Sequence, residues 1–138
     1  MTLYAFIDGA SRGNPGESGI GLIVKDQNGR RILSLEAYIG RTTNNIAEYT
    51  ALLALLTKMK KSQCTRLIVH SDSELMVRQL NKEYKVKDQQ LKKFLQKVSK
   101  VLDDIPFQFE LKHISRNLNA EADKLANNGI DSKKRIKM

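Results

Sequence analysis

The sequence predicts an α/β protein built on a five-stranded mixed sheet, an antiparallel meander followed by parallel strands, with helices on its faces. Three observations support this class. The N-terminal part of the chain holds strand-like segments joined by turn residues, which is typical of an antiparallel meander. After residue 43 the apolar residues recur at helical spacing. Two later strand-like segments are then separated by helical ones, which favours parallel pairing.

The first three elements are predicted strands. Residues 2–8 form an apolar run that ends at Asp8, and residues 18–25 and 31–40 form the next two strands. The pair Asn28-Gly29 lies between these last two and predicts a tight hairpin turn. Together they predict the meander.

The rest of the chain alternates between helices and strands. Residues 44–61 carry Ile46, Tyr49, Leu53 and Leu56 at the spacing of an amphipathic helix. The elements expected after it are strand 65–72, helix 73–84, helix 88–104, strand 106–115 and helix 119–130. We expect the last helix to stop at Asn127-Asn128-Gly129, because these residue types favour helix ends.

Length and composition predict one domain. The chain has 138 residues, of which 41% are hydrophobic and 28% charged, as in a globular protein with a core. We assign residues 1–130 to this domain and 131–138 to a basic, flexible tail. No apolar run could span a bilayer, and the N-terminus lacks the features of a secretory signal. The single Cys64 excludes an internal disulfide and a cysteine metal cluster. We therefore expect a cytoplasmic protein with no membrane partner.

The formal net charge is +9. An excess of Lys and Arg of this size favours a polyanionic partner such as nucleic acid. A solubilising surface is the alternative, and charge alone does not decide between them.

Four acidic residues are the candidate functional groups. Asp8 and Asp72 end predicted strands that could be neighbours in the sheet, while Glu48 and Asp123 lie early in predicted helices. Structural alternatives exist for three of them. Asp72 could cap the helix that follows, Glu48 could form a capping box with Asn45, and Asp123 could favour its helix dipole. Asp8 has the weakest alternative, because it follows an apolar strand.

A cluster of these acids would require a cation. Neighbouring carboxylates repel one another and raise each other's pKa unless positive charge neutralises them. Hard oxygen ligands suit Mg²⁺ or Mn²⁺ rather than zinc. Carboxylates, such a cation and a substrate phosphate together form the setting of phosphoryl-transfer chemistry.

Four segments carry a resemblance to a known family. In chain order they are "DGASRGNPG", "TTNNIAEYTALLALL", "IVHSDSELMVRQL" and "SRNLNAEADKLAN", and each contains one of the four acids. They make the chain similar to ribonuclease H of type 1 over nearly its whole length. The match is to the short form without a basic protrusion, as in archaeal-type members. The resemblance implies the five-stranded mixed sheet already predicted.

The resemblance also implies an activity. The family hydrolyses the RNA strand of RNA–DNA hybrids with two Mg²⁺ or Mn²⁺ ions per site, leaving 5′-phosphate and 3′-hydroxyl ends. Asp8, Glu48, Asp72 and Asp123 would bind the metals, with Asp8 between them. We expect a monomer with no obligate protein partner. The alternatives are a catalytically silent module that binds hybrid or duplex RNA, and a nuclease of the same fold that cuts DNA.

Further roles follow by the same resemblance. Arg116 is the favoured candidate for product release, and His113 is the second. The substrate-binding candidates, of which Asn119 would orient the site near the last acid, are Gly9, Ser11, Gly13, Asn14, Thr43, Asn44, Asn45 and Asn119.

Lysines follow the third acid where longer members carry the basic protrusion. They stand at positions 82, 85 and 87, and on the next predicted helix at 92, 93, 97 and 100. These lysines either compensate for the absent protrusion or form a solvated face, and without compensation hybrid binding would be weaker.

Overall fold

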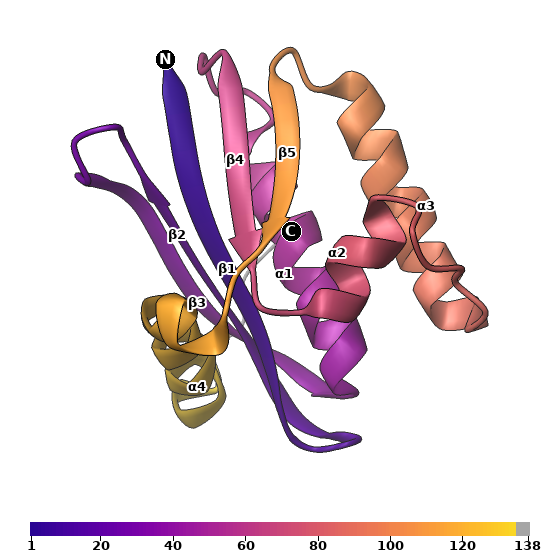
Figure 1. Cartoon of the computed structure of the whole chain (residues 1–138). Helices are drawn as coiled ribbons and strands as arrows, with labels where there is room; N and C mark the ends of the chain where they lie inside the picture. The colour runs from indigo at the N-terminus through magenta and orange to yellow at the C-terminus, as the bar shows by residue number, and fades with distance from the viewer. Residues whose placement is uncertain (135–138) are drawn as a thin grey trace.

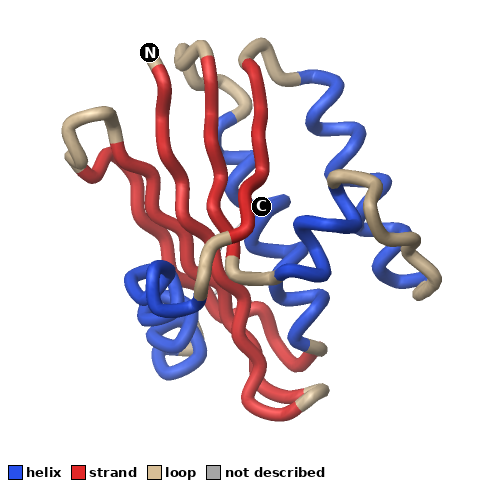
Figure 2. The backbone as a smooth tube through the Cα atoms, viewed as in Figure 1, coloured by secondary structure: helices blue, strands red, loops and turns tan. Residues whose placement is uncertain are grey.

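The computed structural model describes residues 1–134 and contains the predicted mixed sheet (Figures 1 and 2). The elements in chain order are β1 (Thr2–Gly13), β2 (Gly16–Lys25), β3 (Arg31–Thr42), α1 (Asn44–Met59), β4 (Arg66–Ser71), α2 (Glu74–Leu80), α3 (Gln89–Asp104), β5 (Gln108–His113), the 3₁₀ helix η1 (Arg116–Asn119) and α4 (Ala120–Ser132). Within residues 1–134, no helix combines the length and the apolar character needed to cross a membrane.

The sheet has the strand order β3-β2-β1-β4-β5. β2 pairs antiparallel with both β1 and β3, whereas β4 pairs parallel with β1 and with β5. The predicted meander and the predicted contact between the first and fourth strands are therefore confirmed. Because β1 and β4 run in the same direction, the residues that follow their pairing meet at one end of the sheet.

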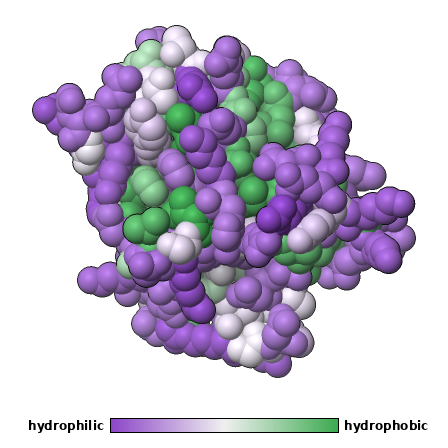
Figure 3. Space-filling model, viewed as in Figure 1, coloured by the Kyte–Doolittle hydropathy of each residue, from purple (hydrophilic) through white to green (hydrophobic). Residues whose placement is uncertain are grey.

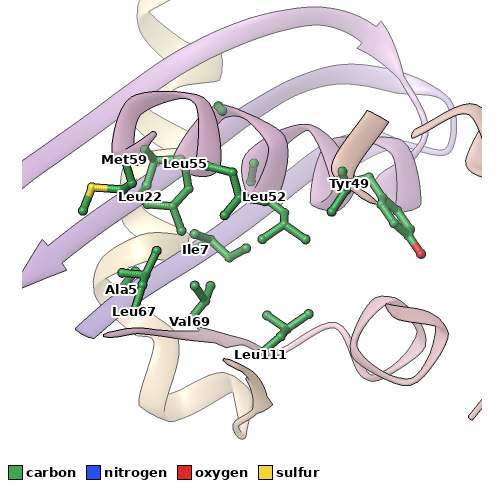
Figure 4. Close-up of a cluster of buried hydrophobic side chains, with 14 of the residues drawn as sticks. Ala5, Ile7, Leu22, Tyr49, Leu52, Leu55, Met59, Leu67, Val69 and Leu111 are labelled. Atoms are coloured by element: carbon green, nitrogen blue, oxygen red, sulfur yellow. The ribbon is translucent and has the colours of Figure 1, made fainter. Parts of the chain in front are cut away.

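Helices cover both faces of the sheet. Figure 1 shows α1, α2 and α3 on one face and α4 on the other, where it packs over β2 and β3. The core lies between the sheet and α1, where Ile7, Leu22 and Val69 meet Leu52 and Leu55 (Figure 4). All five side chains are buried, and burial of each stabilises the fold by about 1.5–3 kcal/mol. This core fixes α1 against the middle of β1.

β1 is longer than the sequence predicts, and the expectation that it ends at Asp8 was wrong. The parallel ladder with β4 stops at the pair Ile7–Ser71. The antiparallel ladder with β2 continues as far as Gly13 and Gly16. Asp8 is thus the first residue of β1 beyond the end of β4, in a strand that still has β2 on its other side.

The C-terminal helix also differs from the expectation. α4 does not stop at Asn127-Asn128-Gly129 but continues to Ser132, and Lys133 ends it in the left-handed region with a φ of 51°. Gly129 serves packing instead, because a Cβ there would collide with the backbone of Ala37 on β3. Residues 135–138 of the predicted tail lie outside the described residues.

Candidate functional site

Three of the four predicted acids meet at one end of the sheet. Asp8 lies on β1, Asp72 follows β4 directly, and Glu48 lies in the N-terminal half of α1. One carboxylate oxygen of each lies within 4.8 Å of the other two. Asp8 and Glu48 are both only 4% exposed, so water reaches little of their surface. The fold therefore gathers negative charge from three separate parts of the chain into one cluster, of which two members are buried and Asp72 is half-buried.

Contacts between β1 and α1 position Glu48. The backbone N–H of Gly9 donates to Glu48 Oε1, and a side chain at Gly9 would collide with the backbone of Ala47. α1 is capped instead by Thr43, whose Oγ1 accepts from the backbone N–H of Ile46 at 3.3 Å. The capping-box alternative for Glu48 is therefore wrong, and its carboxylate faces the cluster.

Asp72 is also not a helix cap. The N-cap of α2 is Ser73, whose Oγ accepts from the backbone N–H of Met76 at 3.2 Å. Ser71, which precedes Asp72, accepts from the N–H of Ser73 at 3.1 Å. Because the hydroxyls of Ser71 and Ser73 accept from the backbone N–H groups at the start of α2, the Asp72 carboxylate remains available to the cluster.

Asp123 reaches the cluster from the other face of the sheet. It lies in the first turn of α4, where its charge also favours the helix dipole, as the structural alternative supposed. Its carboxylate is near enough to Asp8 to raise the pKa of that residue. Asp123 can therefore favour the dipole of α4 and also contribute its carboxylate to the cluster.

The negative charge of this cluster is not balanced by basic side chains among the described residues. Burial, and then repulsion from Glu48 and Asp72, raises the pKa of Asp8 far above its usual range. Burial likewise raises the pKa of Glu48, although the N–H of Gly9 opposes the effect. Within residues 1–134 no Lys or Arg forms an ion pair with any of these acids. Oxygen ligands at this spacing fit a hard divalent cation such as Mg²⁺ or Mn²⁺.

A cavity of about 330 Å³ opens over the cluster. The predicted residues that line it are Asp8, Gly9, Ser11, Asn44, Glu48, Asp72, Arg116 and Asp123. Sequence analysis did not identify four further lining residues, Ala10, Arg12, Ser73 and Asn127. Asn127 could have been found, because it lies one helical turn after Asp123 and therefore on the same face of α4.

Other substrate-binding candidates form a second group nearby. Asn14, Thr43 and Asn45 line a smaller cavity of about 180 Å³ together with residues 88, 90 and 91 at the start of α3. The two groups are linked, because Asn14 Oδ1 accepts from the backbone N–H of Asn44 at 3.1 Å. Gly13 turns the chain before Asn14 with a φ of +108°, a region that glycine tolerates best.

Two candidates lie away from these cavities. His113 is an exposed residue at the end of β5 and lines neither of them. Arg116 on η1, in contrast, lines the cavity over the acidic cluster. Asn119 is 1% exposed and donates through Nδ2 to the backbone oxygen of Ile7 at 2.8 Å. Its side chain therefore fixes the start of α4 to β1 beside Asp8 and does not face the cavity.

A larger cavity, of about 550 Å³, lies between α2, α3 and β5. Leu95, Leu102 and Phe109 contribute to its lining, and Figure 3 shows hydrophobic surface between β5 and α3. It contains none of the four acids. We therefore take the cavity of about 330 Å³ over the acidic cluster as the candidate active site.

The chain matches one family profile and has several similar sequences of known name. A family profile described as reverse transcriptase-like matches residues 6–129. The chain is 33% identical over 129 residues to ribonuclease HI of Halobacterium salinarum, covering 94% of this chain and 64% of that protein. It is 36% identical over 133 residues to bifunctional protein Rv2228c of Mycobacterium tuberculosis, covering 96% of this chain. The chain spans only 36% of that longer relative.

Solved structures agree in fold. LC11-RNase H1, solved in complex with an RNA/DNA hybrid, is 39% identical with a TM-score of 0.88, covering 94% of this chain and 97% of that one. RNase H1 from Halobacterium salinarum is 32% identical with a TM-score of 0.90, covering 96% of this chain and 99% of that one. The five-stranded mixed sheet and its helices are thus shared with these enzymes.

Proposed function

Because the chain belongs to the type 1 ribonuclease H family, we propose that it hydrolyses the RNA strand of RNA–DNA hybrids as a metal-dependent endonuclease. The observation that carries this proposal is the cluster of buried Asp8, buried Glu48 and half-buried Asp72, whose carboxylates lie within 4.8 Å of one another without a basic partner among the described residues. A silent binding module would have no use for so costly a concentration of charge.

The acids have distinct parts in the proposed reaction. Asp8 lies beside all three other acids and would contact both cations, while Glu48, Asp72 and Asp123 complete the ligand set. Held by these four acids, two Mg²⁺ or Mn²⁺ ions would supply an activated water and charge stabilisation for the leaving 3′ oxygen, and the products would be 5′-phosphate and 3′-hydroxyl ends. The N–H of Gly9 keeps Glu48 directed at the cluster before substrate binds.

The neighbouring polar residues fit a hybrid. Asn44 lines the acidic cavity and Asn45 the adjacent smaller one, so the start of α1 spans both. Asn side chains donate and accept, and can contact 2′-hydroxyls in the wide minor groove. A solved relative that is 39% identical binds an RNA/DNA hybrid, which supports the same substrate here. Arg116, at the cavity edge, is our candidate for product release. The monomeric state and cytoplasmic location stay predictions.

Cleavage of chimeric strands tests the substrate assignment. We would pair end-labelled DNA strands that contain one or more consecutive ribonucleotides with complementary DNA, and incubate them with Mg²⁺, Mn²⁺ or EDTA. We expect cuts within or at the edge of a run of several ribonucleotides, much less cutting at a single one, and none in EDTA. Equal cutting of all-DNA duplex would favour the DNA nuclease. Binding without any cleavage would favour the silent module.

A further inference from the structure

Asp123 differs from the other three acids in how it is held. The close group of carboxylate oxygens contains only Asp8, Glu48 and Asp72. Asp123 is carried by α4, which packs on the opposite face of the sheet from α1 (Figure 1). No backbone N–H fixes its carboxylate, in contrast to Glu48, among the hydrogen bonds of residues 1–134. Repulsion from Asp8 would therefore turn Asp123 away unless another group restrains it.

Asn127 is in place to restrain it. Its Nδ2 donates to the backbone oxygen of Asp123 at 3.0 Å and lies 3.5 Å from Asp123 Oδ1. The longer contact is at the limit of hydrogen bonding, as is common for catalytic groups before substrate is bound. An Asn amide can face a carboxylate with its nitrogen or its oxygen, and only the nitrogen attracts it. The orientation of the Asn127 amide therefore decides whether Asp123 is held or repelled.

Arg12, from the other end of the chain, favours the same amide orientation as the hydrogen bond from Asn127 Nδ2 to the backbone oxygen of Asp123. Its Nη2 lies 3.4 Å from both the Oδ1 and the backbone oxygen of Asn127. Because a guanidinium can only donate, it selects the orientation that leaves the Asn127 nitrogen on Asp123. Arg12 Nη1 donates to Asp131 Oδ1 at 2.6 Å, a contact that lowers the pKa of Asp131 and fixes the guanidinium over α4.

We propose that Arg12 and Asn127 are positioning residues that hold the Asp123 carboxylate toward Asp8 for cation binding. This inference rests on the proposed function, since it assigns a purpose to both residues at that site. Asp131, Arg12 and Asn127 form one series of contacts that ends on Asp123, which we name the Arg12–Asn127 link. It joins residues 115 positions apart, from β1 to α4.

Asn127→Ala and Arg12→Ala test the link. Each variant should raise the Mg²⁺ concentration for half-maximal cleavage and lower kcat by about 10-fold, the usual effect of groups that orient metal ligands. The KM for hybrid should stay within about 2-fold of the wild-type value, since neither change alters the candidate hybrid-binding residues at the start of α1. The double variant should change kcat and the Mg²⁺ requirement little more than either single variant does, because both residues act through the same contact with Asp123.

A matched control separates positioning from general support of α4. Arg31 Nη2 forms a 2.7 Å ion pair with Glu121, which fastens the same helix to β3 at similar exposure to the Arg12–Asp131 pair. Arg31→Gln should lower the thermal midpoint in EDTA about as much as Arg12→Ala does, but leave the Mg²⁺ requirement unchanged. Equal Mg²⁺ requirements in all variants, or the same increase in Arg31→Gln, would overturn the proposal.

Metal binding without substrate provides a readout that does not depend on cleavage. The rise in thermal midpoint on adding Mn²⁺ to the wild type should be smaller in Asn127→Ala and Arg12→Ala, and unchanged in Arg31→Gln. An increased KM for hybrid with a normal Mn²⁺ response would instead make Arg12 a phosphate contact and refute the link. If the wild type binds Mn²⁺ but cuts no hybrid, the proposed function fails while this measurement still tests the positioning of Asp123.

Discussion

Two regions of the molecule carry unbalanced charge of opposite sign, and they differ in burial. The acidic cluster lies beside the middle of β1 and just after the end of β4, with Asp8 and Glu48 buried and Asp72 half-buried, and it has no basic partner among the described residues. The segment from residue 82 to residue 100 is its counterpart. It holds seven lysines against two acidic residues, and all seven lysines are exposed. Within residues 1–134, none of these lysines forms an ion pair, because Glu83 pairs with Arg78 and Asp88 caps α3.

The difference in burial assigns different partners to the two regions. A buried carboxylate has lost its water and requires a cation at bonding distance. An exposed lysine keeps its water and attracts a polyanion over a longer range that salt screens. The cavity lined by both Asn45 and Gln90 lies between the start of α1, which carries Glu48, and the start of α3, which carries Lys92 and Lys93. The acids would perform the chemistry while the lysines contribute affinity.

The largest expected effect is that of Asp8→Asn. We expect hybrid cleavage to fall by at least about 100-fold, more than the loss of a group that only orients a ligand. The thermal midpoint in EDTA should stay the same or rise, because the change removes one of several repelling charges. Activity and thermal unfolding are measured on the same preparation. Cleavage near the wild-type rate would remove Asp8 from the mechanism.

Glu48→Gln should have the next largest effect. The Gln oxygen can still accept from the N–H of Gly9, so the contact between β1 and α1 is retained. We expect cleavage to fall by roughly 10- to 100-fold while the fold is preserved, because an amide is a much poorer ligand for Mg²⁺ than a carboxylate. The measurement is kcat against Mg²⁺ concentration. Full activity would mean that Glu48 serves structure alone.

A smaller effect is expected from the lysine-rich region. Lys92→Gln with Lys93→Gln should weaken hybrid binding and lower the slope of log affinity against log salt by about 0.9 for each phosphate that a lysine no longer neutralises. The matched control is Lys58→Gln with Lys61→Gln, which removes two exposed lysines in and just after the last turn of α1 that form no ion pair within residues 1–134. Binding is measured in EDTA at several salt concentrations. Equal slopes in both double variants would make the region a solvated face.

The smallest effect concerns stability and pH. The folded pKa values of Asp8 and Glu48 are raised above their unfolded values, which lie near about 4. Their contribution to metal-free stability is therefore complete below about pH 4 and is lost as pH rises through the raised folded values. We expect the thermal midpoint in EDTA to fall between about pH 5 and 9, because both groups ionise more readily in the unfolded chain than in the folded protein. Asp8→Asn should reduce this slope, and Mg²⁺ should stabilise more at the higher pH. A slope unaffected by Asp8→Asn would contradict the assignment.

The sequence by itself determined the kinds of elements and their order, and it supplied the four acids as candidates for the site. These follow from information within a few residues: the change of hydrophobic period near residue 43, the Asn28-Gly29 turn, and acids next to apolar segments. It also allowed the contact between the first and fourth strands to be inferred, because helices separate strands that run parallel.

Only the tertiary structure decided which groups each acid and amide contacts. Local spacing allowed Glu48 and Asp72 to be caps, but Thr43 and Ser73 perform that role, because the chain before each helix places their hydroxyls on the free N–H groups. The extension of β1 past Asp8 depends on pairing with β2, and the burial of Asn119 depends on α4 packing against β1. Such contacts join residues far apart in the chain, and packing of whole elements decides them, so no short segment of sequence contains them.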